Sequence, residues 1–143
     1  MTLDVRLSVL FQAVIVLLML LVCDAFTWLA LHFHLINFNM DVFWVISLSF
    51  TFVFVVCNCL IFVYAENMNT YWQHSILAYA VIAFISSILA GKLSGLSIDS
   101  AGSFRWIYIV FSIGYIIFLS MIRTMRWIVV LAKREDKRLR GED

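Results

Sequence analysis

Residues 42–64 read VFWVISLSFTFVFVVCNCLIFVY, an apolar run that contains no charged side chain. A membrane-spanning helix needs about 20 such residues, because the hydrocarbon layer is about 30 Å thick and each helical residue rises about 1.5 Å. The run therefore predicts a transmembrane helix, and it sets the frame for the sequence on either side.

The chain as a whole is also strongly apolar. Of its 143 residues, 64% are hydrophobic and 13% are charged, and the mean hydropathy is +1.02. A soluble domain would carry about 25% charged residues. We therefore expect the lipid bilayer to be the main partner of the chain. With a formal net charge of +1, we expect no nucleic-acid partner.

Three further apolar runs have the length of a membrane span or approach it. They predict helices over residues 7–31, 73–91 and 104–126, in addition to 42–64. We expect one all-α domain over residues 1–143, an integral membrane four-helix bundle with a short charged tail over 127–143. The first run lacks a small-residue cleavage site, which favours a retained signal-anchor over a cleaved signal peptide.

The distribution of basic residues predicts which side of the membrane each end occupies. Seven of the ten lysines and arginines lie at the end of the fourth run or after it, from Arg123 onward, whereas Lys92 and Arg105 flank the last loop. Basic residues are enriched on the cytoplasmic side. Four crossings return the chain to its starting side, so we expect both termini to be cytoplasmic.

Asp24 interrupts the first apolar run, in LVCDAFTWLALHFH at residues 21–34. If the helix ends at Cys23, this carboxylate lies at the membrane interface. If the helix continues to Leu31, the carboxylate lies about two turns below the surface. A buried charge is costly unless it is paired. We therefore expect Asp24 to be interfacial or paired with Arg105.

Two sets of residues have the spacing of helix contacts in a membrane, where small side chains allow close approach and polar side chains form interhelical hydrogen bonds. In the third run, the small residues recur every fourth position. In the second run, the polar residues are four and seven apart, and the asparagine needs a partner because it is far from water. The two sets are Ala83, Ser87 and Gly91, and Ser47, Thr51 and Asn58.

The end of the fourth run carries residues typical of a membrane interface. Arg123 and Arg126 can reach lipid phosphates, and Trp127 suits the headgroup level. Residues 133–143 combine five basic with four acidic side chains. This tail is expected to be solvated, with weak contact to anionic lipids.

The sequence contains no catalytic motif: it lacks a nucleophile elbow, a phosphate loop and a histidine box. We therefore expect neither an enzyme nor a bound cofactor. His32 and His34 could form an outer metal site with Asp41, but we interpret them as interfacial aromatic residues. The same interpretation applies to His74 and its neighbours Tyr71 and Trp72, and Cys23, Cys57 and Cys59 are interpreted as small apolar fillers.

Three functional classes follow from these features. The favoured class is a non-catalytic scaffold or accessory subunit of a larger membrane complex. The alternative is a small homo-oligomeric transporter or channel that uses Asp24 as an intramembrane carboxylate. A third class, a lipid- or tetrapyrrole-handling bundle using the histidines, ranks last. The sequence leaves the membrane open between endomembrane, plasma membrane and ciliary membrane.

The chain resembles the transmembrane protein 107 family in its length and number of spans. The resemblance also rests on LSFT at residues 48–51 and WIYIVFS at residues 106–112. It departs from that family in its less polar first outer loop and its longer charged tail. The resemblance implies a gatekeeping scaffold at the ciliary transition zone.

Overall fold

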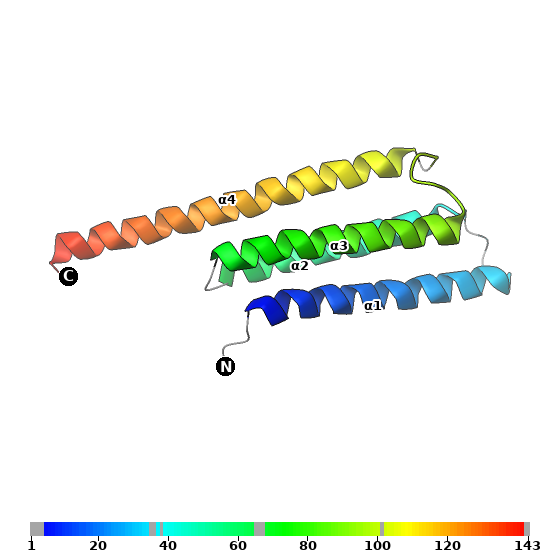
Figure 1. Ribbon diagram of the computed structural model, residues 1–143, viewed down its shortest axis with the longest axis horizontal. Helices are drawn as coiled ribbons and strands as arrows, with labels where there is room; N and C mark the ends of the chain where they lie inside the picture. The colour runs from blue at the N-terminus through cyan, green and yellow to red at the C-terminus, as the bar shows by residue number, and fades with distance from the viewer. Residues whose placement is uncertain (1–4, 35–36, 38, 65–67, 101, 142–143) are drawn as a thin grey trace.

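The computed structural model describes residues 5–34, 37, 39–64, 68–100 and 102–141, and these form an all-α structure. Its helices are α1 (Val5–His32), α2 (Val42–Tyr64), α3 (Met68–Ser94) and α4 (Ser103–Arg140) (Figure 1). Each is long and apolar enough to cross a membrane. The prediction of an all-α structure with four helices of span length is therefore confirmed.

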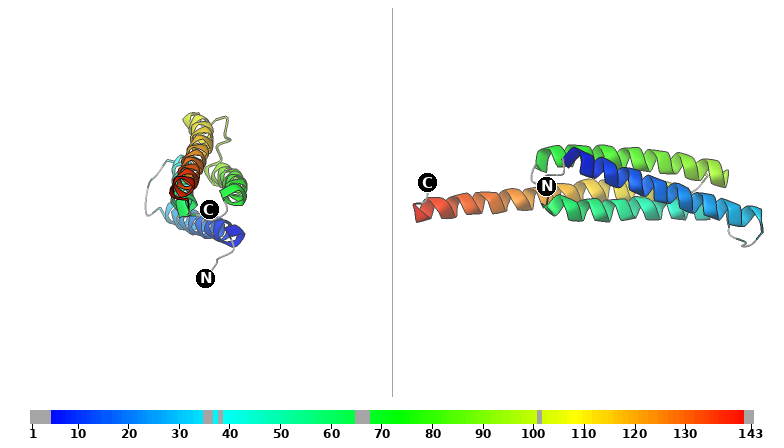
Figure 2. Two further views of the ribbon diagram at one scale, coloured as in Figure 1. Left: turned by 90° about the vertical axis from the view of Figure 1, so that its left-hand side faces the viewer. Right: turned by 90° about the horizontal axis from the view of Figure 1, so that it is seen from below.

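The helices run alternately up and down, so that both termini lie at the same end (Figure 1). Helices α1, α2 and α3 contact one another, whereas α4 contacts α2 and α3 only, as far as the described residues go. The view along the bundle shows α4 on the opposite side from α1 (Figure 2). The molecule is thus a three-helix unit with a fourth helix laid against one side.

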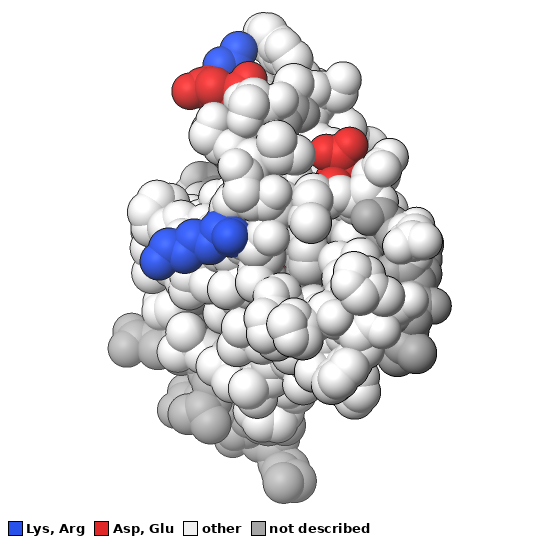
Figure 3. Space-filling model, turned by 90° about the vertical axis from the view of Figure 1, so that its right-hand side faces the viewer, with Lys and Arg blue, Asp and Glu red and all other residues white. Residues whose placement is uncertain are grey.

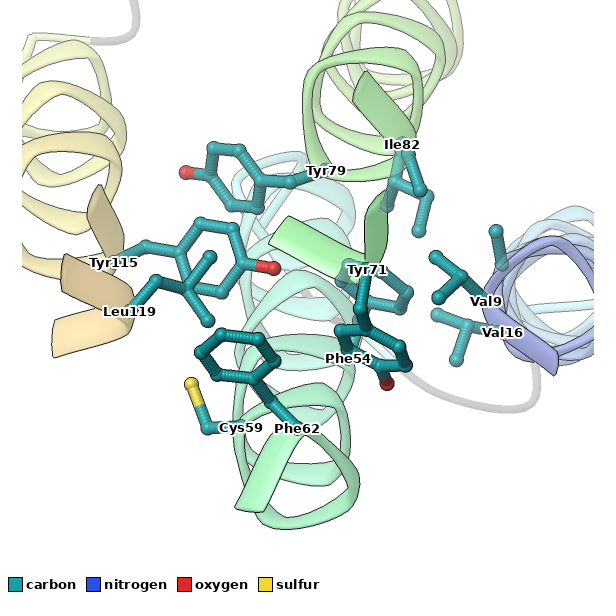
Figure 4. Packing of buried hydrophobic residues seen from close by; sticks show 12 residues of the cluster. Val9, Val16, Phe54, Cys59, Phe62, Tyr71, Tyr79, Ile82, Tyr115 and Leu119 are labelled. Carbon is teal, nitrogen blue, oxygen red and sulfur yellow. The ribbon is translucent and has the colours of Figure 1, made fainter. Parts of the chain in front are cut away.

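Buried apolar residues form two clusters, one toward each end of the bundle. On α1, the buried positions Val9, Ala13, Val16 and Leu20 recur every three or four residues, which places them on one helix face. Figure 4 shows part of the first cluster, where Tyr115 of α4 points between α2 and α3. Many large apolar side chains on the other faces of the helices are exposed.

Two helix boundaries differ from the sequence prediction. Helix α3 begins at Met68 rather than near residue 73, because Tyr71 is buried and belongs to the first cluster. Tyr71 is therefore a core residue, and its assignment to an interfacial aromatic belt was wrong. Helix α4 continues through the predicted tail to Arg140.

The connection between α3 and α4 turns at Gly95, whose φ of 69° is in the left-handed region that favours glycine. The Ser94 hydroxyl accepts a hydrogen bond from the Leu96 amide, which closes the end of α3. Only scattered charged side chains lie on this end of the molecule (Figure 3). One ion pair there joins Arg105 to Asp99 at 2.8 Å.

Candidate functional site

Asn58 lies at the centre of a polar cluster that joins three helices. Its side chain is fully buried, and its Nδ2 donates to the Tyr71 hydroxyl at 3.4 Å. The Tyr115 hydroxyl of α4 donates to Asn58 Oδ1 at 2.9 Å, with the Ser75 carbonyl oxygen 3.4 Å away. We call Asn58, Tyr71, Ser75 and Tyr115 the Asn58 cluster. The prediction that Asn58 requires a partner is confirmed, and its partners lie within the bundle.

A second polar cluster, the Tyr108 cluster, lies nearer the opposite end. The Tyr108 hydroxyl of α4 is 2.9 Å from Ser47 Oγ and 3.2 Å from Ser86 Oγ. Thr51 Oγ1 donates to the Ser47 carbonyl oxygen at 2.9 Å and lies 3.5 Å from Ser86 Oγ. Ser47, Thr51 and Asn58 are all fully buried, so the predicted shared face of the second span is confirmed.

The tyrosine hydroxyls are the main feature that the sequence analysis missed. Besides Tyr108 and Tyr115, Tyr79 of α3 contacts Ser112 of α4 at 3.0 Å. Tyr108, Ser112 and Tyr115 follow one another at spacings of four and three residues, which places them on one face of α4. That spacing was the available signal, and it identifies the face by which α4 attaches.

The predicted small-residue stripe of α3 is displaced by one position. Ala83, Ser87 and Gly91 are only half-buried, and the Ser87 hydroxyl donates to a backbone carbonyl of its own helix at 3.0 Å. The fully buried positions are instead Ser86 and Ala90. Helix α3 is rotated about its axis relative to the prediction. The reason is that its buried face carries Tyr71 and Tyr79, and this face packs against α2 and α4. The predicted stripe therefore borders the contact face rather than forming its centre. Ala83 packs against both apolar clusters, and a Cβ atom at Gly91 would lie 3.9 Å from the Trp44 ring.

Asp24 is buried but not paired with Arg105. Its exposed fraction is 2%, and neither carboxylate oxygen has a hydrogen-bond partner among the described groups. Arg105 binds Asp99 instead, six residues earlier in the exposed connection. The predicted pair is therefore not formed, because a nearer carboxylate takes the arginine. Helix α1 continues to His32, about 12 Å beyond Asp24, so this carboxylate lies well inside the helix.

The helix geometry places Asp24 on the buried face of α1. It follows Val16 by eight residues, or about two turns, and Val16 belongs to the cluster that contains Phe54 and Ile82. The helix periodicity and the burial of Asp24 therefore agree that this carboxylate is turned into the bundle.

The predicted interface anchors divide into two that contact the bundle and one that does not. The Arg123 guanidinium lies 5.4 Å from the ring centre of Trp72, and Arg126 Nη1 donates to the Phe62 carbonyl oxygen at 3.1 Å. This bond satisfies a carbonyl in the last turn of α2, where helices lack internal partners. Trp127 is exposed. Arg126 thereby fixes where α4 passes the end of α2.

Beyond Arg126, α4 projects past the other helices (Figure 2). The first five projecting residues, Trp127–Leu131, are all apolar and all exposed. Five consecutive helical residues point in every direction around the axis. We call this segment the apolar collar. It is followed by charged residues with helical ion pairs, Arg138–Glu135 at 3.6 Å and Arg140–Asp136 at 3.3 Å.

A lateral groove with a volume of about 570 Å³ separates the faces of α2 and α4. Its walls are apolar apart from the Cys59 thiol and the Tyr115 hydroxyl, and Gly114 leaves part of the α4 wall without a side chain. Phe52 and Phe111, whose ring centres are 5.7 Å apart, lie between this groove and a smaller one of about 400 Å³ nearer the α3–α4 connection. We call the larger hollow the α2–α4 groove.

The histidines show local contacts rather than a ligand set. His32 stacks on Trp28 with ring centres 5.3 Å apart, and His74 Nδ1 lies 2.7 Å from the Thr70 carbonyl oxygen. In the described part of the chain, no three His, Cys, Asp or Glu side chains come together as a metal site would require. The metal site considered for His32, His34 and Asp41 therefore gains no support.

Comparison of the chain with protein-family models, with curated proteins and with solved structures finds no match.

Proposed function

We propose that the protein is a multi-pass membrane protein with both termini cytoplasmic, and that it acts without catalysis as a scaffold or accessory subunit of a larger membrane complex. The observation that carries this proposal is the apolar collar, Trp127–Leu131. This segment is where we expect another subunit to bind.

The collar lies beyond the level at which the arginines of α4 place the membrane interface. Arg123 and Arg126 lie beside the ends of α3 and α2, and arginines near span ends place their guanidinium groups at the headgroup level. The collar then extends past the hydrocarbon layer. An all-round apolar segment in water is unfavourable, since burying one large apolar side chain stabilises by about 1.5–3 kcal/mol. A partner that covers the collar supplies this burial.

The experiment is purification in a mild detergent, comparing the wild type with Ile128→Lys and Leu139→Lys. Ile128 is in the collar, whereas Leu139 is an equally projecting apolar residue in the charged segment. We expect a stoichiometric partner that Ile128→Lys releases and Leu139→Lys retains. Equal thermal stability of the three purified chains would show that the bundle is intact. The proposal fails if the wild type is recovered alone, or if Leu139→Lys releases the partner equally well.

A second candidate function, a small proton- or cation-coupled transporter, is favoured by Asp24. The specific observation is a carboxylate that is 2% exposed in a span-length helix and lacks a hydrogen-bond partner among the described groups. Ionisable side chains inside a membrane are rare and commonly functional. Proton-driven uptake by the protein in liposomes, abolished by Asp24→Asn and retained by Asp41→Asn, would favour this function over the scaffold.

Which cellular membrane contains the protein is a separate proposal. The resemblance to the transmembrane protein 107 family suggests the ciliary membrane, whereas the plasma membrane and endomembranes are the alternatives. We also propose weak contact of the tail, residues 133–143, with anionic lipids. Imaging of a tagged chain in ciliated cells tests the location, and concentration of the signal at the ciliary base would support it.

A further inference from the structure

We propose that the α2–α4 groove binds one acyl chain of a phospholipid from the leaflet on the side of the two termini. This inference rests on the proposed membrane insertion of the bundle, but it is independent of the scaffold function. It assigns a ligand to a groove whose walls consist almost entirely of apolar side chains.

The chemistry of the groove fits a hydrocarbon chain. The Tyr115 hydroxyl, one of its two polar groups, donates to Asn58 and points into the bundle (Figure 4). The remaining walls can offer only dispersion contacts, which are individually small but add up along a flexible chain. A ligand with polar groups along its length would leave them without partners, and such groups are costly in a dry environment.

The length of the groove matches one leaflet. Its lining runs from Phe52 to Val63 on α2 and from Val110 to Ile122 on α4. These stretches are about 16–18 Å long at 1.5 Å per residue, close to half of the hydrocarbon thickness of about 30 Å. The stacked rings of Phe52 and Phe111 separate the groove from the smaller hollow beyond. A partner helix that crosses the bilayer would need a groove continuous past that stack, whereas an acyl chain ends near the midplane.

A basic residue lies at the opposite end, where the headgroup would be. Arg126 follows the lining residue Ile122 by one turn on the same face of α4, and it contacts the Phe62 carbonyl beside the lining residue Val63. The guanidinium keeps its positive charge while it makes this contact, and a positive charge attracts an anionic phosphate. The groove therefore combines an apolar channel of leaflet length with a positive charge at its mouth.

Gly114 provides a way to fill the groove without disturbing the bundle. A Cβ atom added at this position meets no heavy atom within 4 Å. Gly114→Ala therefore adds one methyl group to open space and is the matched control, whereas Gly114→Phe places a ring in the groove. Val110→Trp, at an exposed lining position of the same helix, is a second filling variant.

The test is photocrosslinking in phosphatidylcholine vesicles that contain phosphatidylglycerol with a diazirine near the end of one acyl chain. We expect adducts concentrated on residues 52–63 and 110–122. Both filling variants should reduce these adducts about fivefold, which corresponds to about 1 kcal/mol of lost contact, and Gly114→Ala should stay within about twofold of wild type. Arg126→Gln should also reduce them, because it removes the charge at the mouth.

Three outcomes would overturn the lipid site. Adducts spread evenly over all four helices would indicate ordinary surrounding lipid only. Adduct yields unchanged by both filling variants would also contradict it, as would dimers or a bound partner helix that Gly114→Phe disrupts. Alkaline carbonate extraction of the same vesicles separates the two proposals. A chain released by carbonate contradicts membrane insertion itself, whereas a retained chain with evenly spread adducts contradicts only the groove ligand.

Discussion

Asn58 and Asp24 are both buried in apolar helices, yet their bonding is opposite. The Asn58 side chain donates a hydrogen bond to the Tyr71 hydroxyl of α3 and accepts one from the Tyr115 hydroxyl of α4. Neither carboxylate oxygen of Asp24 has a hydrogen bond in the described part of the molecule. The amide thus stabilises the bundle, whereas the described residues offer the carboxylate no contact that compensates for its burial. The difference indicates that burial alone does not reveal why a polar residue occupies an apolar helix.

The largest expected effect is that of Asn58→Ala. It leaves the hydroxyls of Tyr71 and Tyr115 without this partner in a buried place, which should lower the free energy of unfolding by about 2 kcal/mol. Reversible unfolding in detergent measures this loss. Asn69→Ala, at an exposed position near the start of α3, is the control and should have little effect. Equal losses for the two variants would remove Asn58 from its structural role.

Asp24→Leu should act in the opposite direction. Replacing an unbonded buried carboxylate by an apolar side chain should raise the free energy of unfolding by about 1 kcal/mol, since insertion into apolar surroundings strongly favours leucine over aspartate. The same unfolding assay applies, with Asp41→Leu at the exposed end of the bundle as the control. A loss of stability as large as that of Asn58→Ala would show that Asp24 has a structural partner, and the contrast would disappear.

The smallest effect distinguishes two adjacent serines of α3. Both hydroxyls donate to a carbonyl of their own helix, but Ser86 is also fully buried and lies 3.2 Å from the Tyr108 hydroxyl of α4. Ser86→Ala should lower the free energy of unfolding by about 0.5 kcal/mol, and Ser87→Ala should change it by less. If the order is reversed, the small-residue stripe predicted from the sequence is the true contact face.

The sequence was sufficient to predict the number of helices and the polar face of α2. Apolar runs of span length bounded by polar connectors have few other structures available to them. A buried asparagine must find a partner, so the bonding of Asn58 followed from its position alone. These predictions required only the periodicity and chemistry of single segments.

The sequence did not predict how each helix is rotated about its own axis relative to its neighbours. The contact face of α3 is set by where Tyr71 and Tyr79 pack, and this depends on the tyrosines and serines of α4. The choice of partner for Arg105 likewise depends on the path of the connection, which brings Asp99 close. Both are properties of three-dimensional placement, and no single segment contains them.

The bond between Arg126 and the Phe62 carbonyl divides α4 into two arms, one on each side of the point where it passes the end of α2. From this point, one arm reaches Ser103 over about 35 Å and the other reaches Arg140 over about 21 Å. A rigid α4 turning about this bond would move its charged end opposite to Ser103 by about three fifths of the displacement. Such a turn would have to break the contacts of Tyr108 and Tyr115 with α2. Distance measurements between spin labels on both arms and α1 would detect this motion, and equal displacements in one direction would exclude a pivot.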